Sequence, residues 1–162
     1  YRRQRQMCIR DSSQVVERAC AQYAPRAGEK GVALTVGRAE GSAVFDPKWT
    51  EEAVCNLLCN GYEAAVQAGR EEPQVVLRVR AERMWTVLEV EDNGPGIPPE
   101  RQGKIFEPFV TSKNTNYNWG MGLYYVRKIV RSHLGRLRLE SRDGEGARFQ
   151  IMLPLYDPRQ KE

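Results

Sequence analysis

Apolar residues recur at helical spacing in three stretches of the chain, residues 13–27, 46–68 and 122–134. Asp46, which is followed by proline, is a favourable helix start because its carboxylate can accept from the first free backbone amides. Gly135 follows the third stretch and is expected to end it. The sequence therefore predicts three helices.

Five other stretches alternate between apolar and polar residues and predict strands: residues 32–36, 74–80, 85–91, 136–141 and 147–153. A short polar turn separates the second stretch from the third, which indicates an antiparallel hairpin. The order of the elements is helix, strand, helix, two strands, loop, helix, two strands. This order predicts an α+β fold, a two-layer α/β sandwich in which helices cover one face of a mixed, mostly antiparallel sheet.

The two ends of the chain carry no comparable pattern. We interpret residues 1–12 as a linker or a cloning remnant, residues 13–157 as one folded domain and residues 158–162 as a tail. No apolar run approaches the about 20 residues that cross a bilayer, so we expect no direct membrane contact from this chain.

Composition and charge exclude several function classes. The net charge is +4, from 25 Lys and Arg against 21 Asp and Glu, but the basic residues are scattered rather than clustered. The densest group, Arg127, Lys128 and Arg131, lies on one predicted helix, so we expect no nucleic-acid partner. The four cysteines form no CxxC pair, and Cys55 and Cys59 are expected to be small packing residues in a reducing cytosol.

The residues that could carry chemistry are weak signals one at a time. Asn56 and Asn60 share a helical face because they are four residues apart, but alone they could be solvent-facing amides. The run 92–96 could be an ordinary tight turn. Gly120 and Gly122 precede a helix whose free amides could bind an anion, although such glycine pairs are common.

Their order along the chain is far more specific. Five motifs follow one another: Asn56-Leu57-Leu58-Cys59-Asn60, Asp92-Asn93-Gly94-Pro95-Gly96-Ile97, Phe106-Glu107-Pro108-Phe109, Gly120-Met121-Gly122-Leu123 and Gly144-Glu145-Gly146-Ala147-Arg148-Phe149. From about Val15 to Pro154 the sequence resembles the catalytic ATP-binding domain of sensor histidine kinases. That domain belongs to the GHKL superfamily, shared with gyrase, heat-shock chaperone and mismatch-repair ATPases, and has a Bergerat-type fold. The motifs look like its N box, first glycine box, F box, second glycine box and final strand turn.

The resemblance implies roles for these residues in binding ATP and Mg²⁺. Asn60 would coordinate magnesium on the phosphates, and Asn56 would support metal and phosphates from one helical turn away. Asp92 would accept from the adenine amino group. Gly94 and Gly96 would let the backbone pass close to the base, since neither has a Cβ.

The resemblance also implies a lid and a phosphate-binding turn. Lys113 resembles a lid lysine that reaches the terminal phosphates, although it could be an ordinary exposed lysine. With Asn56 and Asn60 it completes the expected catalytic set. The other expected nucleotide contacts are Ile97, Phe109, Thr111, Gly120, Met121, Gly122 and Leu123. Phe109 could equally serve, with Phe106, as a packing residue of the lid hinge.

The residue at position 56 differs between the branches of the superfamily, and Asn56 favours the histidine kinases. The ATPase branches and the serine-kinase anti-sigma factors place a glutamate at this position, and an amide cannot take a proton near neutral pH. The family's acceptor position does not coincide with His133, the only histidine, so we assign His133 to packing or helix capping.

We therefore expect a protein-histidine kinase domain whose phosphoacceptor and dimerisation domain lies outside this chain. A downstream response regulator is its expected second partner. We expect a monomer that forms the cytoplasmic portion of a bacterial sensor. The alternative is a catalytically degenerate nucleotide-binding module, because Glu63 stands where many members have a phosphate-contacting lysine and the lid lacks its usual glycine.

Overall fold

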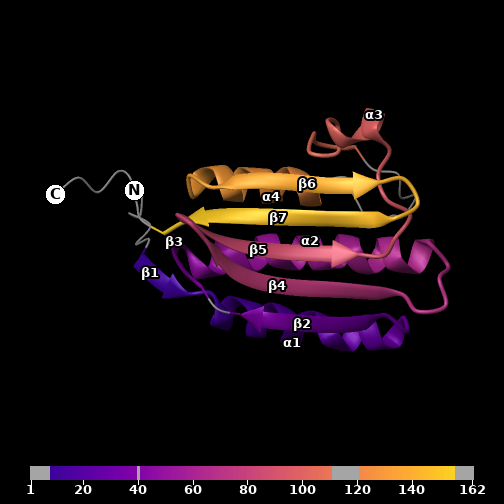
Figure 1. Ribbon diagram of the computed structural model, residues 1–162, viewed down its shortest axis with the longest axis horizontal. Helices are drawn as coiled ribbons and strands as arrows, with labels where there is room; N and C mark the ends of the chain where they lie inside the picture. Colours follow the sequence, from indigo (N-terminus) through magenta and orange to yellow (C-terminus); the bar gives the residue numbers. More distant parts are fainter. Residues whose placement is uncertain (1–7, 40, 111–120, 156–162) are drawn as a thin grey trace.

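A five-stranded sheet with helices on one face forms the body of the molecule (Figure 1). The computed structural model describes residues 8–39, 41–110 and 121–155. The sheet runs in the order β2-β4-β5-β7-β6, and only β2 and β4 pair in parallel. Its strands are β2 (Ala33–Ala39), β4 (Gln74–Glu82), β5 (Trp85–Asp92), β6 (Arg136–Arg142) and β7 (Gly146–Pro154). The predicted α+β sandwich with a mostly antiparallel sheet is confirmed.

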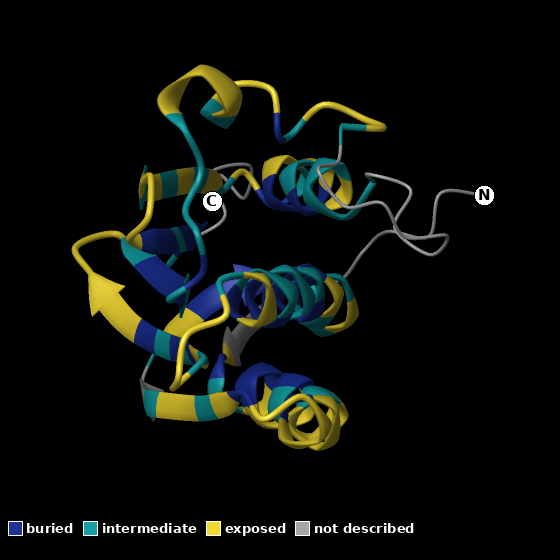
Figure 2. Ribbon diagram, turned by 90° about the vertical axis from the view of Figure 1, so that its right-hand side faces the viewer, coloured by how far each residue is buried: buried dark blue, intermediate teal, exposed yellow. Residues whose placement is uncertain are grey.

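Three long helices cover the sheet: α1 (Ser13–Glu29), α2 (Pro47–Gln67) and α4 (Gly122–Ser132). Buried positions gather between these helices and the sheet (Figure 2). Val54 and Leu58 of α2, with Leu88 and Val90 of β5, are at most 2% exposed. Apolar burial on this scale contributes about 1.5–3 kcal/mol for each large side chain, so the core between α2 and the central strands is the main source of stability.

Two short strands lie outside the predicted pattern. β1 (Cys8–Asp11) pairs antiparallel with β3 (Ser42–Phe45), and Ser12, which is fully buried, donates its hydroxyl hydrogen to the Gly41 carbonyl at 2.7 Å. Residues 1–12 are predicted to lie outside the folded domain, but residues 8–12 belong to it through these contacts. The short helix α3 (Pro99–Gln102) has no counterpart among the predicted elements.

The sheet face away from the helices carries a network of charged side chains around Glu89. Its carboxylate accepts from Arg78 at 3.0 Å, Arg80 at 2.9 Å and Gln150 at 2.7 Å. Burial alone would raise the pKa of Glu89, but these hydrogen bonds and the charge of Arg148 hold the pKa below its ordinary value. The carboxylate is therefore stabilised in its ionised form by strands on both sides of β5.

His133 connects the end of α4 to the start of α2. The Asp46 backbone amide donates to its Nε2 at 3.0 Å, and its Nδ1 lies 2.7 Å from the Ile129 carbonyl oxygen. The side chain is 2% exposed, so the predicted packing role is confirmed. Asp46 also caps α2 as predicted, because its carboxylate accepts from the amides of Lys48 and Trp49.

The C-terminus of α4 differs from the prediction that Gly135 ends it. The helix ends at Ser132, and Leu134 adopts the left-handed conformation, with φ of 56°. Gly135 is needed for space instead, because an added Cβ would lie 2.6 Å from the Met152 carbonyl oxygen. The left-handed position that usually takes glycine therefore holds a leucine.

Within the described residues, no helix combines the length and apolar character that a bilayer crossing requires.

Cys55 lies in the core as predicted, and burial raises the pKa of its thiol to about 12, so the thiol stays protonated at neutral pH.

We predict that His133→Ala lowers the free energy of unfolding by about 2–4 kcal/mol. The change leaves a cavity and removes the acceptor for the Asp46 amide. Urea unfolding followed by circular dichroism would measure the loss. Arg131→Ala, at an exposed position two residues before His133, should change the free energy of unfolding by no more than about 0.5 kcal/mol. An equal loss in both variants would contradict the role of His133 in connecting α4 to α2.

We predict that Leu134→Gly is more stable than Leu134→Ala by about 1 kcal/mol. Both variants remove the same exposed side chain, but only glycine adopts the left-handed conformation without strain. Thermal unfolding of the pair would test this, and equal midpoints would show that the φ of Leu134 carries no cost.

Candidate functional site

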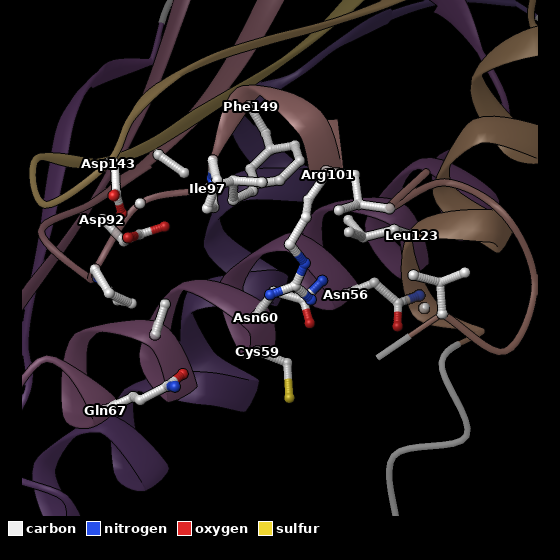
Figure 3. Close-up of a pocket in the computed structure, with 18 residues that line it drawn as sticks. Asn56, Cys59, Asn60, Gln67, Asp92, Ile97, Arg101, Leu123, Asp143 and Phe149 are labelled. Carbon is white, nitrogen blue, oxygen red and sulfur yellow. The ribbon is translucent and has the colours of Figure 1, made fainter. Parts of the chain in front are cut away.

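A cavity of about 370 Å³ lies between α2, the loop after β5, the start of α4 and the β6–β7 turn (Figure 3). Arg101 of the short helix α3 and Phe149 of β7 also line it. Apolar walls with a few convergent polar groups are typical of a small-molecule site. The polar groups come from four separate parts of the chain.

Helix α2 supplies one wall of the cavity. Asn56, Cys59, Asn60, Ala64 and Gln67 all line it, at spacings of three and four residues. Residues at these spacings form one stripe along a helix. The opposite stripe, with Val54 and Leu58, faces the core, so the sequence places polar and apolar residues on two different faces of α2.

Asp92 lines the cavity from the last position of β5. It is 6% exposed, and its Oδ1 accepts from the Gly94 amide at 2.8 Å. Gly94 does not itself line the cavity, because it packs against α2. An added Cβ would lie 2.7 Å from the Cβ of Ala64 and 2.7 Å from the Asp92 Oδ1. The absence of a side chain at Gly94 thus allows the loop to approach the helix and to orient the carboxylate.

The loop from residue 93 to 98 is fixed to the β6–β7 turn. Gly144 donates its amide hydrogen to the Pro95 carbonyl at 2.6 Å, and the Ile97 amide donates to the Ser141 hydroxyl at 2.9 Å. Gly96 has a φ of 77°, and an added Cβ would collide with the Arg142 carbonyl oxygen. Gly96 and Ile97 both line the cavity, where the fixed loop forms its roof.

The N-terminus of α4 closes the other end of the cavity. Gly122 and Leu123 line it, and an added Cβ on Gly122 would lie 3.3 Å from the Asn56 Oδ1. No side chain caps this helix start among the described residues. The first amides of a helix have no intrahelical acceptor and carry a partial positive charge, so this end suits an anion.

Among the predicted site residues, seven line the cavity together: Asn56, Asn60, Asp92, Gly96, Ile97, Gly122 and Leu123. Met121, the N-cap residue of α4, and Phe109, which is 72% exposed, do not line it. Thr111, Lys113 and Gly120 lie outside the described residues. Their predicted contacts with a nucleotide, like the role of Phe109, stay predictions.

Sequence reasoning missed four polar residues of the cavity: Cys59, Gln67, Arg101 and Asp143. Cys59 and Gln67 continue the α2 stripe at helical spacing from Asn56 and Asn60, so the spacing could have identified them. Cys59, which we expect to be a packing residue, is partly buried and lies in the cavity wall. Arg101 and Asp143 lie in a short helix and a turn, where no periodicity predicts the direction of a side chain.

Comparison with known families assigns most of the chain. The family model described as histidine kinase-, DNA gyrase B- and HSP90-like ATPase matches residues 45–157. The alginate biosynthesis sensor protein KinB of Pseudomonas aeruginosa is 38% identical over 105 residues, which cover 65% of this chain and 17% of that protein. The C4-dicarboxylate transport sensor protein DctS of Rhodobacter capsulatus is 33% identical over 153 residues, or 93% of this chain and 23% of that protein. The chain therefore spans less than a quarter of the length of these two relatives.

Solved structures show the same fold. The catalytic domain of histidine kinase ThkA superposes with a TM-score of 0.78 at 22% identity, covering 93% of this chain and 96% of that one. The mycobacterial sensor histidine kinase MprB gives a TM-score of 0.74 at 27% identity, covering 91% and 97% of the two chains. The predicted resemblance is confirmed: the chain belongs to the family of histidine kinase-, DNA gyrase B- and HSP90-like ATPases, and within it to the catalytic domains of sensor histidine kinases.

Proposed function

We propose that this chain binds ATP with magnesium in the cavity and transfers the γ-phosphoryl group to a histidine on a separate phosphoacceptor domain. The observation that carries the proposal is the polarity of one cavity. Carboxylates of Asp92 and Asp143 lie at one end, and Asn56, Asn60 and the N-terminus of α4 lie toward the other (Figure 3). An adenine amine and a phosphate chain require opposite environments of this kind.

Asp92 suits the adenine end. An ionised carboxylate only accepts hydrogen bonds, so it can pair with an exocyclic amine but not with the carbonyl that guanine carries at the same position. The Gly94 amide donates to Oδ1 and so helps to orient the carboxylate in the cavity wall. This geometry supports a preference for ATP over GTP.

Asn60 and Asn56 suit the phosphate end. An amide oxygen is a hard ligand, and Mg²⁺ in phosphate sites takes few protein ligands and completes its octahedron with phosphate oxygens and waters. Asn60 would hold the metal and Asn56 would support it from one turn away. When bound, magnesium neutralises charge on the phosphates, and the chain's own contribution is to position them for in-line transfer.

The acceptor histidine must come from another segment. His133 is buried, and its ring nitrogens contact Asp46 and Ile129, so it cannot approach a phosphate without opening the core. In the proposed reaction an imidazole nitrogen of the acceptor forms a bond to the γ-phosphorus. The bond between the γ-phosphorus and the β–γ bridging oxygen breaks, and ADP leaves. The proposed partners are therefore a dimerisation and phosphoacceptor domain and a downstream response regulator. We propose a cytoplasmic setting, where ATP is present.

We predict that Asp92→Ala weakens binding of a non-hydrolysable ATP analogue about tenfold to a hundredfold. The reason is that the adenine amine loses a charged acceptor, a change of roughly 1–3 kcal/mol. Calorimetric titration in the presence of magnesium would measure it. Glu100→Ala, which removes an exposed carboxylate outside the cavity, should bind as tightly as the unaltered chain. Equal affinity of Asp92→Ala and Glu100→Ala would contradict the assigned adenine site.

We predict that the chain, mixed with the dimerisation segment of a sensor histidine kinase and labelled ATP, places label on that segment's histidine only when magnesium is present. Asn60→Ala should slow the transfer at least about tenfold, whereas Asn60→Asp, which keeps an oxygen ligand, should slow it less. Nucleotide binding without any transfer would instead favour a regulatory nucleotide-binding module.

A further inference from the structure

Arg101 is the one basic residue among the described residues that line the cavity. Its side chain extends from α3 into the cavity, and its guanidinium points toward Asn60 (Figure 3). Within the described part of the chain, no hydrogen bond or ion pair holds this guanidinium. With no such partner among the described residues, the guanidinium is available to a ligand.

The backbone that carries Arg101 is anchored to the sheet. The Gln102 Nε2 donates to the carbonyl oxygens of Ile97, at 2.8 Å, and of Ser141, at 3.1 Å. The Arg101 amide donates to the Pro98 carbonyl at 2.9 Å, and Ile105, just beyond α3, is buried in the core. These contacts fix both ends of the segment from residue 97 to 105. The fold thus places the Arg101 backbone beside the cavity that its side chain lines.

The other described polar groups that line the cavity carry no full positive charge. Asp92 and Asp143 make one end negative, while Asn56 and Asn60 are neutral amides that orient a ligand but neutralise no charge. The N-terminus of α4 contributes only a partial positive charge. A triphosphate keeps a net negative charge even with one magnesium ion bound, and a phosphate oxygen makes its strongest hydrogen bonds with a charged donor.

We propose that Arg101 binds the phosphate chain of the nucleotide and so serves as a binding residue of this site that none of the five sequence motifs contains. The inference rests on the proposed function, because it requires a nucleotide with its phosphates at the Asn60 end. The guanidinium presents a planar fork of donors that can engage two phosphate oxygens at once. An arginine at this position would favour nucleotides with a long phosphate chain over adenosine.

The test compares the full chain with three variants, Arg101→Ala, Arg101→Lys and Lys104→Ala. Lys104 is an exposed cation three residues from Arg101 that does not line the cavity, so its variant controls for the loss of one positive charge. NMR titrations with adenosine and with a non-hydrolysable ATP analogue, in magnesium, measure both weak and tight binding. The spectra also report whether each variant is folded.

We expect Arg101→Ala to bind the triphosphate analogue about tenfold to a hundredfold more weakly and adenosine with unchanged affinity. Arg101→Lys should lose less, because it keeps the charge but not the fork. Lys104→Ala should match the unaltered chain. The loss in Arg101→Ala should also shrink at high salt, as expected for an interaction between charges.

Unchanged triphosphate affinity in Arg101→Ala, or an equal loss for adenosine and triphosphate, would overturn this inference and leave the nucleotide site intact. A loss of equal size in Lys104→Ala would overturn it too, since the effect would then reflect net charge alone. If the unaltered chain bound neither ligand, the proposed function itself would fail, and the assignment of Arg101 with it.

Discussion

Close backbone contact around Asp92 is the constraint on which the rest of the site depends. Three glycines permit it: Gly94 lies against Ala64 of α2, Gly96 against the Arg142 carbonyl, and Gly146, with φ of 94°, against the Asp92 carbonyl. A Cβ at any of them would collide with backbone or with a buried side chain. Because these contacts hold the loop after β5 between α2 and the β6–β7 turn, one buried carboxylate faces the cavity in a single orientation. The end of β6, which contacts Gly96, also anchors α3 through the bond from Gln102 to the Ser141 carbonyl.

The fold brings three distant segments together, so that one end of the cavity has acidic side chains and the other has the N-terminus of α4. Strands β5 and β6 end at the Asp92 side of the cavity, whereas α4 begins at the other side, where its first amides have no intrahelical acceptor. Helix α2 runs along the wall between them and presents amide side chains rather than charges. A ligand with a hydrogen-bond donor at one end and phosphates at the other is therefore oriented by the architecture before any single contact is counted. This explains why a domain without a cluster of metal-binding side chains among its described residues can still suit a magnesium nucleotide.

The sequence was sufficient for the elements with strong periodicity and insufficient where tertiary contacts decide. The three long helices and the five strands of the main sheet follow from apolar spacing, and the ordered motifs predict which residues meet at the cavity. β1 and β3 are too short to show a period, and each exists only because the other pairs with it. Leu134 adopts a left-handed conformation, and the glycine that follows it is required because a Cβ on Gly135 would collide with the Met152 carbonyl, a contact between segments far apart in sequence. The segment that carries Arg101 is likewise placed beside the cavity by the bond between Gln102 and Ser141 across the fold, so local sequence gives no signal for it.

Asn56 shows how one side chain limits the chemistry of the whole cavity. Its Nδ2 donates to the Glu52 carbonyl at 3.1 Å, which turns Oδ1 toward the start of α4. An amide in this arrangement can orient phosphates or metal-bound water but cannot accept a proton from water or from a hydroxyl group. A nucleophile that attacks here must bring a lone pair that needs no base, as a neutral imidazole does. The geometry at Asn56 and the burial of His133 thus lead to the same consequence: the cavity is suited to hold a phosphoryl donor, and the acceptor must be brought to it from outside.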